Sequence, residues 1–174
     1  LNVPPSTLTQ YCDTLTICLS KGLGAPIGSL LCGSAEYIKQ ARRWRKMVGG
    51  GMRQAGILAE AARYALLNNV ERLREDHDNA QWLANELSAI GVEVLAPGAQ
   101  TNMLFLKVPA HEAAQLGGWM KERGVLMSAG PVTRIVTHLD VSRSDLEKLV
   151  SLWKEFKQSI NTQSSTTASK AIYG

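Results

Sequence analysis

The 174-residue sequence contains no apolar run that approaches the roughly 20 residues needed to cross a bilayer. Its first residues, LNVPPSTLTQ, lack the basic and apolar regions of a signal peptide. The three cysteines, Cys12, Cys18 and Cys32, are odd in number and show no C-x-x-C spacing, which argues against a disulfide framework and against a zinc site. We therefore expect a cytoplasmic protein with reduced thiols, no metal centre and no membrane contact.

Neither the proportion of charged residues nor the net charge of the chain is unusual. Charged residues make up 20% and hydrophobic residues 45% of the chain, as in ordinary folded domains. The net charge is +4, and the densest basic cluster is KQARRWRK, residues 39–46. On a helix this segment would have a basic face opposite an apolar stripe. The basic face comprises Lys39, Arg42, Arg43 and Lys46.

The apolar stripe of this helix, which we expect to be buried, comprises Tyr37, Ala41, Trp44 and Val48. A single buried tryptophan differs from the exposed aromatic array that stacks on nucleic-acid bases. We therefore expect a solvated basic face and no nucleic-acid partner. A non-enzymatic basic binding module is the alternative.

Short apolar segments alternate with helical patterns in the first half of the chain. Residues 14–19 and 28–33 are rich in β-branched or apolar types and predict strands. A long helix is predicted over 52–69, after three glycines. The next helix carries His77 on its apolar stripe, where a buried histidine is the common explanation, and ends at Gly91.

The second half continues the alternation, which predicts an α/β protein. Strands are predicted at 92–95, 101–108 and 132–139. Helices are predicted at 111–124 and 142–160, and Ser142 with Asp145 resembles a capping box at the start of the last one. Residues 161–174 are rich in serine and threonine and predict a disordered tail.

Lys21 stands where the first predicted strand ends, in the segment CLSKGLGAPIGSLLCG. Gly22, Gly24 and Gly28 permit close backbone approach, and Pro26 stiffens the loop. A lysine that forms a Schiff base needs such fixed geometry together with partial desolvation. From composition alone, a glycine-rich loop with a solvated lysine is the more ordinary explanation.

Five segments resemble low-specificity L-threonine aldolases, in chain order: CLSKGLGAPIGSLLCG, RRWRKMVGGGMRQAGILA, NNVERLREDHDNA, TNMLF and RIVTHLDVS. The resemblance extends from about Leu8 to Ile160. These aldolases are pyridoxal-phosphate (PLP) enzymes of the aspartate-aminotransferase-like fold. The resemblance therefore implies that this chain is the C-terminal half of such an enzyme. Residues 1–69 would then form the C-terminal part of the large PLP-binding domain, with the last strands of its sheet. Residues 70–160 would form the small α/β domain.

The resemblance also implies the residues of the site. Lys21 matches the lysine that forms a Schiff base with PLP, and Ser20 would lie beside the cofactor. Arg53 and Lys46 match basic residues near the cofactor and the substrate, where positive charge would hold a phosphate or a developing anion. Arg134 matches the arginine that binds the substrate carboxylate through its two-pronged guanidinium. A solvated helix face for Lys46 and a surface strand for Arg134 are the ordinary alternatives.

The implied reaction is the cleavage of L-threonine and L-allo-threonine into glycine and acetaldehyde by a homotetramer. In such enzymes the first half supplies the ring-stacking group, the phosphate cup and the aspartate at the pyridine nitrogen. We therefore expect this 174-residue chain to be inactive alone. Another PLP lyase or an aminotransferase of the same fold is the nearest alternative. His138 and Asp140 suggest a hydrolytic dyad, but no G-x-S-x-G motif accompanies them.

Overall fold

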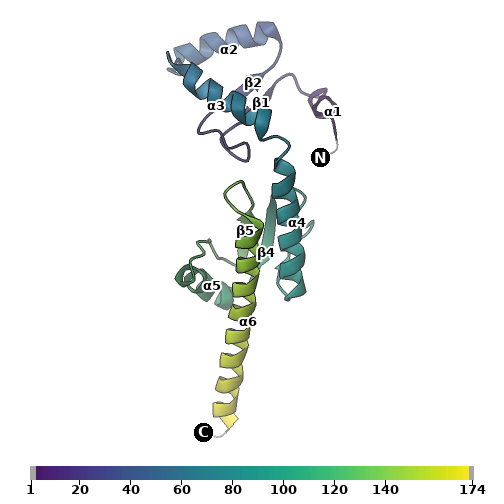
Figure 1. Cartoon of the computed structure of the whole chain (residues 1–174), viewed down its shortest axis with the longest axis vertical. Helices are drawn as coiled ribbons and strands as arrows, with labels where there is room; N and C mark the ends of the chain where they lie inside the picture. The colour runs from purple at the N-terminus through teal and green to yellow at the C-terminus, as the bar shows by residue number, and fades with distance from the viewer. Residues whose placement is uncertain (1–2, 173–174) are drawn as a thin grey trace. The chain divides into compact units, whose positions relative to one another are not determined.

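The computed structural model describes the backbone of residues 3–172 and the side chains of residues 3–162. The chain forms two compact units, Leu1–Arg72 (unit 1) and Leu73–Gly174 (unit 2), whose elements are labelled in Figure 1. The division follows Arg72, a few residues beyond the boundary after Asn69 that the sequence predicts. Each unit has a hydrophobic core of its own.

Unit 1 contains a two-stranded antiparallel ladder and three helices. The helix α1 (Pro5–Thr9) precedes the strands β1 (Leu15–Cys18) and β2 (Ser29–Cys32), and α2 (Ala35–Met47) and α3 (Ala55–Asn68) follow them. Both strands and both long helices of the sequence analysis are confirmed. The core of this unit is small and consists of Leu19, Ala25, Ala62 and Ala65, with Ile17, Leu23 and Leu66 packed against it.

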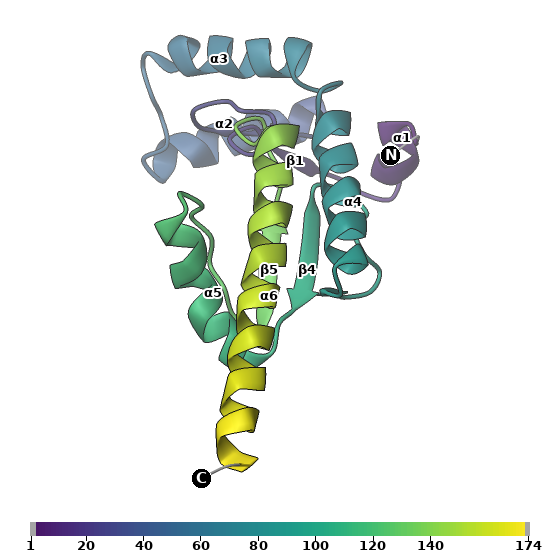
Figure 2. The ribbon, with the colours of Figure 1, turned by 60° about the horizontal axis from the view of Figure 1, so that its bottom comes forward.

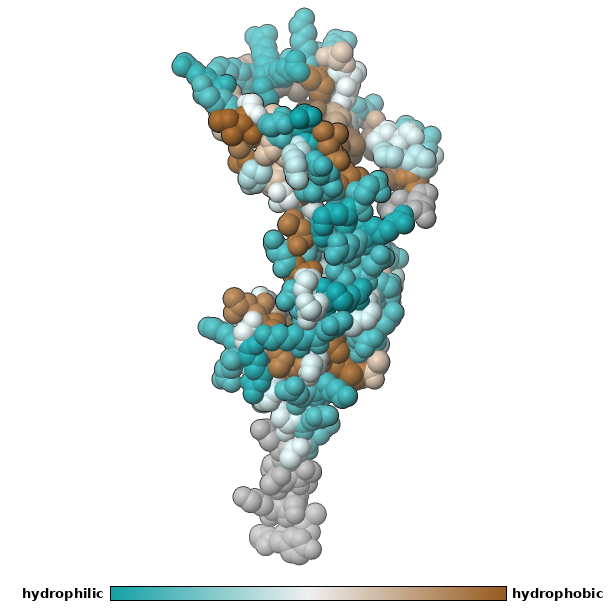
Figure 3. Space-filling view, in the orientation of Figure 1, coloured by the Kyte–Doolittle hydropathy of each residue, from teal (hydrophilic) through white to brown (hydrophobic). Residues whose placement is uncertain are grey.

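The predicted burial of the α2 stripe is wrong for this chain. The helix begins after Ser34, whose side chain accepts a hydrogen bond from the Tyr37 backbone N–H at 3.2 Å. No residue of α2 is buried, however, and Trp44 and Val48 are 62% and 80% exposed. Helical periodicity identifies an apolar face but not what covers it, and no described element covers this one. Figure 3 shows hydrophobic patches, in brown, among the hydrophilic residues of the face in view.

Unit 2 is an antiparallel sheet with helices. Its elements are α4 (Leu73–Ala89), β3 (Glu93–Val94), β4 (Met103–Lys107), α5 (Ala110–Glu122), β5 (Val132–Val136) and α6 (Arg143–Ile172). The strands pair in the order β3-β4-β5, and α4 and α6 lie side by side over one face of the sheet (Figure 2). All three predicted strands and the three helices are confirmed.

The core of unit 2 lies between the sheet and its helices. It includes Leu83 and Leu87 of α4, Leu104 and Leu106 of β4, Leu116 and Met120 of α5, and Trp153 and Phe156 of α6. Two predicted helix ends are confirmed. Gly91 closes α4 with φ +76°, and at α6 the Ser142 N–H donates to Asp145 Oδ2 at 2.9 Å while the Asp145 N–H donates to Ser142 Oγ at 3.2 Å.

Two details of unit 2 differ from the predictions. His77 is only half-buried, whereas Asp76 and Asn79 of the same helix are buried. The Thr137 hydroxyl donates to the Asp76 backbone carbonyl at 2.6 Å, a long-range contact between α4 and the segment after β5. The helix α6 continues to Ile172, where the sequence analysis predicts disorder from residue 161. No glycine or proline interrupts residues 161–172, so the backbone hydrogen bonds of the helix can continue.

Candidate functional site

Lys21 lies on a tight turn in the loop that joins β1 to β2. The Leu19 N–H donates to the Gly28 carbonyl at 3.0 Å, and the Ala25 N–H donates to the Leu19 carbonyl at 3.0 Å. The Gly24 N–H donates to the Lys21 carbonyl at 2.8 Å. Gly24 has φ +72°, a conformation that glycine adopts at little cost. These bonds define the backbone on both sides of Lys21.

The core of unit 1 and one side chain of α3 anchor this Lys21 loop, residues 19–28. Leu19 is 2% exposed and belongs to the same cluster as Ala62 and Ala65 of α3. At the end of α3, Asn69 Nδ2 donates to the Leu23 carbonyl at 2.8 Å. The Lys21 side chain is exposed, and among the described residues its amine has no hydrogen-bond or ion-pair partner. The geometry is therefore a fixed backbone that carries an unpaired primary amine, without the desolvation expected from the sequence.

Ser20 contacts the thiol at the end of β1. Its Oγ atom lies 3.7 Å from Cys18 Sγ, and either group can donate. Hydrogen bonding to the Ser20 side chain, and then to its backbone, lowers the pKa of the Cys18 thiol, with a smaller contribution from the charge of Lys21. Ser20 is exposed, so its hydroxyl remains accessible beside Lys21.

The turn from α2 to α3 brings Lys46 against the segment that leads to Arg53. The Gly49 N–H donates to the Lys46 carbonyl at 3.2 Å, with Gly49 at φ +84°. The Gly50 N–H donates to the Arg45 carbonyl at 2.8 Å, which completes a Schellman motif. A Cβ atom at Gly51 would lie 2.6 Å from Lys46 Cδ, so the lysine stem lies across this glycine.

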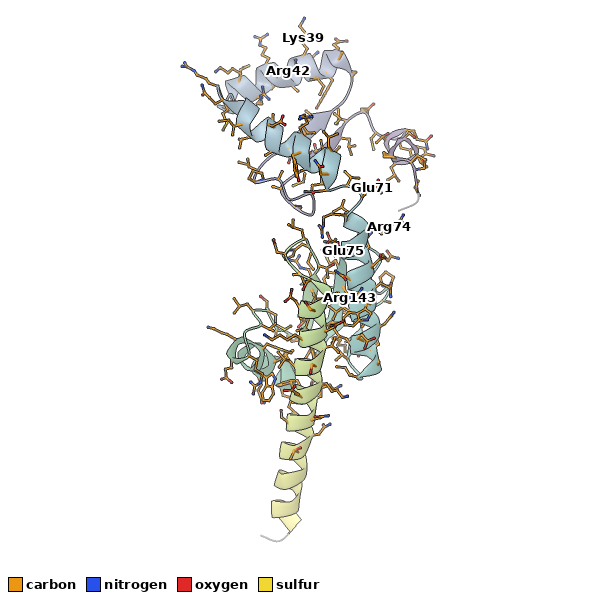
Figure 4. The ribbon with its side chains drawn as sticks, in the orientation of Figure 1. Lys39, Arg42, Glu71, Arg74, Glu75 and Arg143 are labelled. Carbon is orange, nitrogen blue, oxygen red and sulfur yellow. The ribbon has the colours of Figure 1, made fainter. Side chains whose placement is uncertain are left out.

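Lys46 and Arg53 are both exposed. The basic side chains that belong to the middle of α2, Lys39 and Arg42, are also exposed and are drawn in Figure 4. Arg43 is exposed as well, so the predicted solvated basic face of Lys39, Arg42, Arg43 and Lys46 is confirmed. Of these, Lys46 alone is held against the glycine turn by a contact that the structure shows among the described residues.

Arg134 lies on β5 in unit 2, with its side chain exposed. It is paired with Phe105 in the β4–β5 register. Its neighbour Thr133 points to the opposite, buried side of the sheet. Among the described residues the Arg134 guanidinium has no hydrogen-bond or ion-pair partner. Such a group is available to bind a carboxylate with two parallel hydrogen bonds.

A pocket of about 800 Å³ adjoins Arg134. Residues 124–130, β5 and the first turns of α6 line it, and its polar lining includes Ser128, Arg134, His138, Asp140 and Lys148. The Asp140 N–H donates to His138 Nδ1 at 3.3 Å. Asp140 Oδ2 also lies 3.6 Å from His138 Nδ1, beyond hydrogen-bonding distance. In a hydrolytic triad the histidine Nδ1–H donates to the carboxylate, whereas here Nδ1 accepts a backbone hydrogen bond.

The five residues expected from the sequence divide between the units. Lys21, Ser20, Lys46 and Arg53 belong to unit 1, and Arg134 belongs to unit 2. The described residues include no cluster of three or more His, Cys, Asp or Glu side chains that could hold a metal ion. None of the helices that the structure describes has the length and hydropathy to cross a bilayer.

Sequence reasoning missed Asn69, which fixes the Lys21 loop from a distance. Its partner Leu23 lies far away in the sequence, and Asn69 reads only as a polar residue at the end of a helix. Two neighbouring asparagines there are the sole sequence signal, and asparagine at a helix end is common for local reasons.

A family model described as beta-eliminating lyase matches residues 1–110. The low-specificity L-threonine aldolase of Escherichia coli O157:H7 is 60% identical over 149 residues, which cover 86% of this chain and 44% of that protein. The low-specificity L-threonine aldolase 1 of Arabidopsis thaliana is 38% identical over 161 residues, covering 89% of this chain and 45% of that protein. The chain thus spans less than half the length of these relatives.

Solved structures show the fold. Sphingomonas wittichii serine palmitoyltransferase matches with a TM-score of 0.73 at 16% identity, covering 90% of this chain and 42% of that one. A Listeria monocytogenes protein provisionally named L-allo-threonine aldolase matches with a TM-score of 0.68 at 19% identity, covering 86% and 46%. The expected α/β fold of PLP-dependent enzymes, of which the chain comprises a part, is confirmed.

Proposed function

The chain belongs to the beta-eliminating lyase family, and from this premise we propose that it is part of a low-specificity L-threonine aldolase. In this proposal the enzyme uses PLP to cleave L-threonine and L-allo-threonine into glycine and acetaldehyde. The observation that carries the proposal is the 60% identity over 149 residues to the E. coli protein of that name. The unpaired amine of Lys21 on its anchored loop is consistent with it.

The side chains of unit 1 fit the chemistry of PLP, which carries an aldehyde and an anionic phosphate. In the proposal Lys21 binds the aldehyde covalently, because its amine is exposed and unpaired among the described residues. Ser20 supplies a hydroxyl beside it, and Arg53 supplies positive charge for the phosphate. When bound, PLP provides the electron sink for the electron pair left at Cα as the Cα–Cβ bond breaks.

Arg134 and Lys46 bind the substrate in this proposal. The Arg134 guanidinium would hold the α-carboxylate, and Lys46 would add positive charge near it. Residues 1–69 would belong to the large cofactor-binding domain, and residues 70–160 would form the small domain. We further propose that the complete enzyme is a cytoplasmic homotetramer.

The test is product analysis with the full-length protein and PLP. We expect L-threonine to yield glycine and acetaldehyde in equal amounts, and we expect Lys21→Ala to abolish both. Lys39→Ala, which removes an exposed lysine of α2, is the matched control. Borohydride reduction and peptide mapping should place the pyridoxyl group on Lys21. A label on another lysine would contradict the assignment.

β-Elimination is the second candidate, because the matching family model is described as beta-eliminating lyase. This reaction expels the β-substituent of an amino acid and, after hydrolysis, yields a keto acid and ammonia, whereas aldol cleavage yields an aldehyde and glycine. Assaying the same incubations for keto acid distinguishes the two reactions. Formation of keto acid without acetaldehyde would contradict the aldolase proposal and support β-elimination. Aminotransferase activity would also produce keto acid, but only when an amino-group acceptor is added.

A further inference from the structure

Phe105 of β4 and Arg134 of β5 are directly opposite each other in the antiparallel register. In such a ladder, hydrogen-bonded pairs alternate with pairs whose backbones do not bond to each other. The Thr137 N–H donates to the Asn102 carbonyl at 2.9 Å, which marks a hydrogen-bonded pair at one end of the ladder. Every second pair along the ladder from Asn102–Thr137 is hydrogen-bonded, and the Phe105–Arg134 pair lies between two of these pairs. It is therefore a non-hydrogen-bonded pair.

Two further bonds agree with this assignment. The Val108 N–H donates to the Pro131 carbonyl at 3.0 Å, at the other end of the ladder and in the same alternation. The Phe105 carbonyl accepts from the Leu95 N–H at 2.9 Å, on the opposite side of β4 from β5. At non-hydrogen-bonded pairs the Cα atoms are about 4.5 Å apart and the side chains are closest. Phe105 and Arg134 therefore leave the sheet at the shortest cross-strand spacing.

Both side chains lie on the face of the sheet opposite its core. Leu104, Leu106 and Thr133, which alternate with them along the strands, are buried, whereas Phe105 is 41% exposed. On the same face, the charge of Lys107 is already paired with Glu93 at 3.3 Å. Arg134 differs from Lys107, because among the described residues it has no acidic partner. An unpaired arginine and a large aromatic residue that the core of unit 2 does not use thus leave the same face of the sheet from directly opposite positions.

We propose that Phe105 is a positioning residue for Arg134. The ring limits the rotamers of the arginine stem, so that the guanidinium is held ready to donate two parallel hydrogen bonds to the α-carboxylate of an amino acid. A flexible arginine would lose side-chain freedom on binding, and a restricted one loses less. The inference rests on the proposed role of Arg134 as the carboxylate-binding residue.

The first test measures binding without turnover, in the full-length protein with PLP. Glycine is titrated by calorimetry and compared with ethanolamine, which has the same amino group but a hydroxymethyl group in place of the carboxylate. We expect Phe105→Ala to weaken glycine binding roughly three- to tenfold and to leave ethanolamine binding unchanged. Phe105→Leu keeps an apolar side chain and should give a smaller loss, so a result is available even if the alanine variant folds poorly.

Leu139→Ala is the control. Leu139 is an apolar residue of unit 2 that is 48% exposed, and it does not line the pocket that adjoins Arg134. We expect it to leave the glycine affinity unchanged. In an Arg134→Lys background, Phe105→Ala should have no further effect on glycine binding, because the group that the ring positions is absent.

Kinetics supply the second readout. The KM for L-threonine should rise in Phe105→Ala by the same factor as the glycine dissociation constant, with kcat nearly unchanged. Unchanged glycine affinity in Phe105→Ala, an equal loss of ethanolamine affinity, or an equal loss of glycine affinity in Leu139→Ala would overturn the inference. Glycine binding requires no cleavage, so the two proposals can fail separately. If the protein binds glycine but does not cleave threonine, the proposed function is contradicted, and the glycine titrations still test the role of Phe105.

Discussion

The Asn69 side-chain amide donates to the Leu23 carbonyl at 2.8 Å and thereby joins the end of α3 to the Lys21 loop. The loop is also held by its own backbone hydrogen bonds and by a small core of Leu19, Ala25 and two alanines of α3. The Asn69 bond adds a side-chain link between the loop and the end of α3.

Asn69→Ala should loosen the Lys21 loop. The free energy of unfolding should fall by about 1 kcal/mol, the usual net value of one intramolecular hydrogen bond. Amide exchange in residues 19–25 should accelerate, because the Leu23 carbonyl loses its partner. Asn68→Ala is the control, since Asn68 donates only to the Tyr64 carbonyl of its own helix. Equal acceleration in both variants would show that Asn69 does not hold the loop.

Arg134→Lys should weaken the use of substrate while PLP binding persists. A lysine keeps the charge but cannot form the two parallel hydrogen bonds to a carboxylate. We expect the full-length variant to show a roughly 10- to 100-fold higher KM for L-threonine, with PLP affinity within about twofold of the unsubstituted protein. Arg74→Lys, at an exposed arginine of α4 labelled in Figure 4, should change neither quantity. An unchanged KM in Arg134→Lys would remove its proposed role.

The lowered pKa of Cys18 can be measured by alkylation at different pH values. The Ser20 hydrogen bonds favour the thiolate, so the rate of iodoacetamide labelling at Cys18 should rise at lower pH than it does without them. Ser20→Ala removes the largest cause and should move the midpoint of the rate profile to higher pH. Labelling of Cys12 in the same samples, resolved by peptide mapping, is the control. A midpoint that does not move would contradict the Ser20 contact.

The sequence predicted the elements well because its local signals agree with the folded structure. At α6, the Ser142–Asp145 pair marks the start of the helix, and both reciprocal hydrogen bonds are present. The sequence could not predict that Trp44 is exposed, since an apolar stripe does not reveal whether another element covers it. Nor could it predict the bond from Asn69 to Leu23 or the pairing of Phe105 with Arg134, because both contacts depend on tertiary geometry.

The cap of α6 should make the stability of unit 2 depend on pH. Hydrogen bonds from Ser142, first from its hydroxyl and then from its N–H, hold the pKa of Asp145 below the ordinary value of 3.8. Because the folded pKa is depressed, the stabilisation is complete above the unfolded value and is lost as the pH falls through the folded one.

Asp145→Ala should therefore lower stability near neutral pH and flatten the loss of stability in acid. Denaturant unfolding at a series of pH values down to about 2.5 measures both effects. Glu147→Gln, at an exposed residue of the same helix that does not cap it, should keep the original pH dependence. Ser142→Ala should cost about 1 kcal/mol, as for other N-cap residues. Parallel pH profiles for Asp145→Ala and the unsubstituted chain would contradict the role of the cap.

The 174-residue chain alone should bind PLP weakly and should not cleave threonine. Lys21, Ser20, Lys46 and Arg53 are all exposed within it, and a Schiff base on a solvated lysine is weak and reversible. Tight binding needs donors to the phosphate, stacking on the ring and a partner for the pyridine nitrogen at the same time. The exposed side chains of this chain can satisfy the first requirement only in part.

The measurement is a titration of the purified chain with PLP, followed by absorbance and then by gel filtration. We expect the absorbance change to saturate only at high PLP concentration, and we expect the cofactor to separate from the protein on the column. Lys21→Ala and Lys39→Ala should reduce this weak binding to a similar extent, because both lysines are exposed. If the chain retained PLP stoichiometrically and Lys21→Ala alone abolished retention, the residues of this chain would form a more complete cofactor site than their exposure indicates.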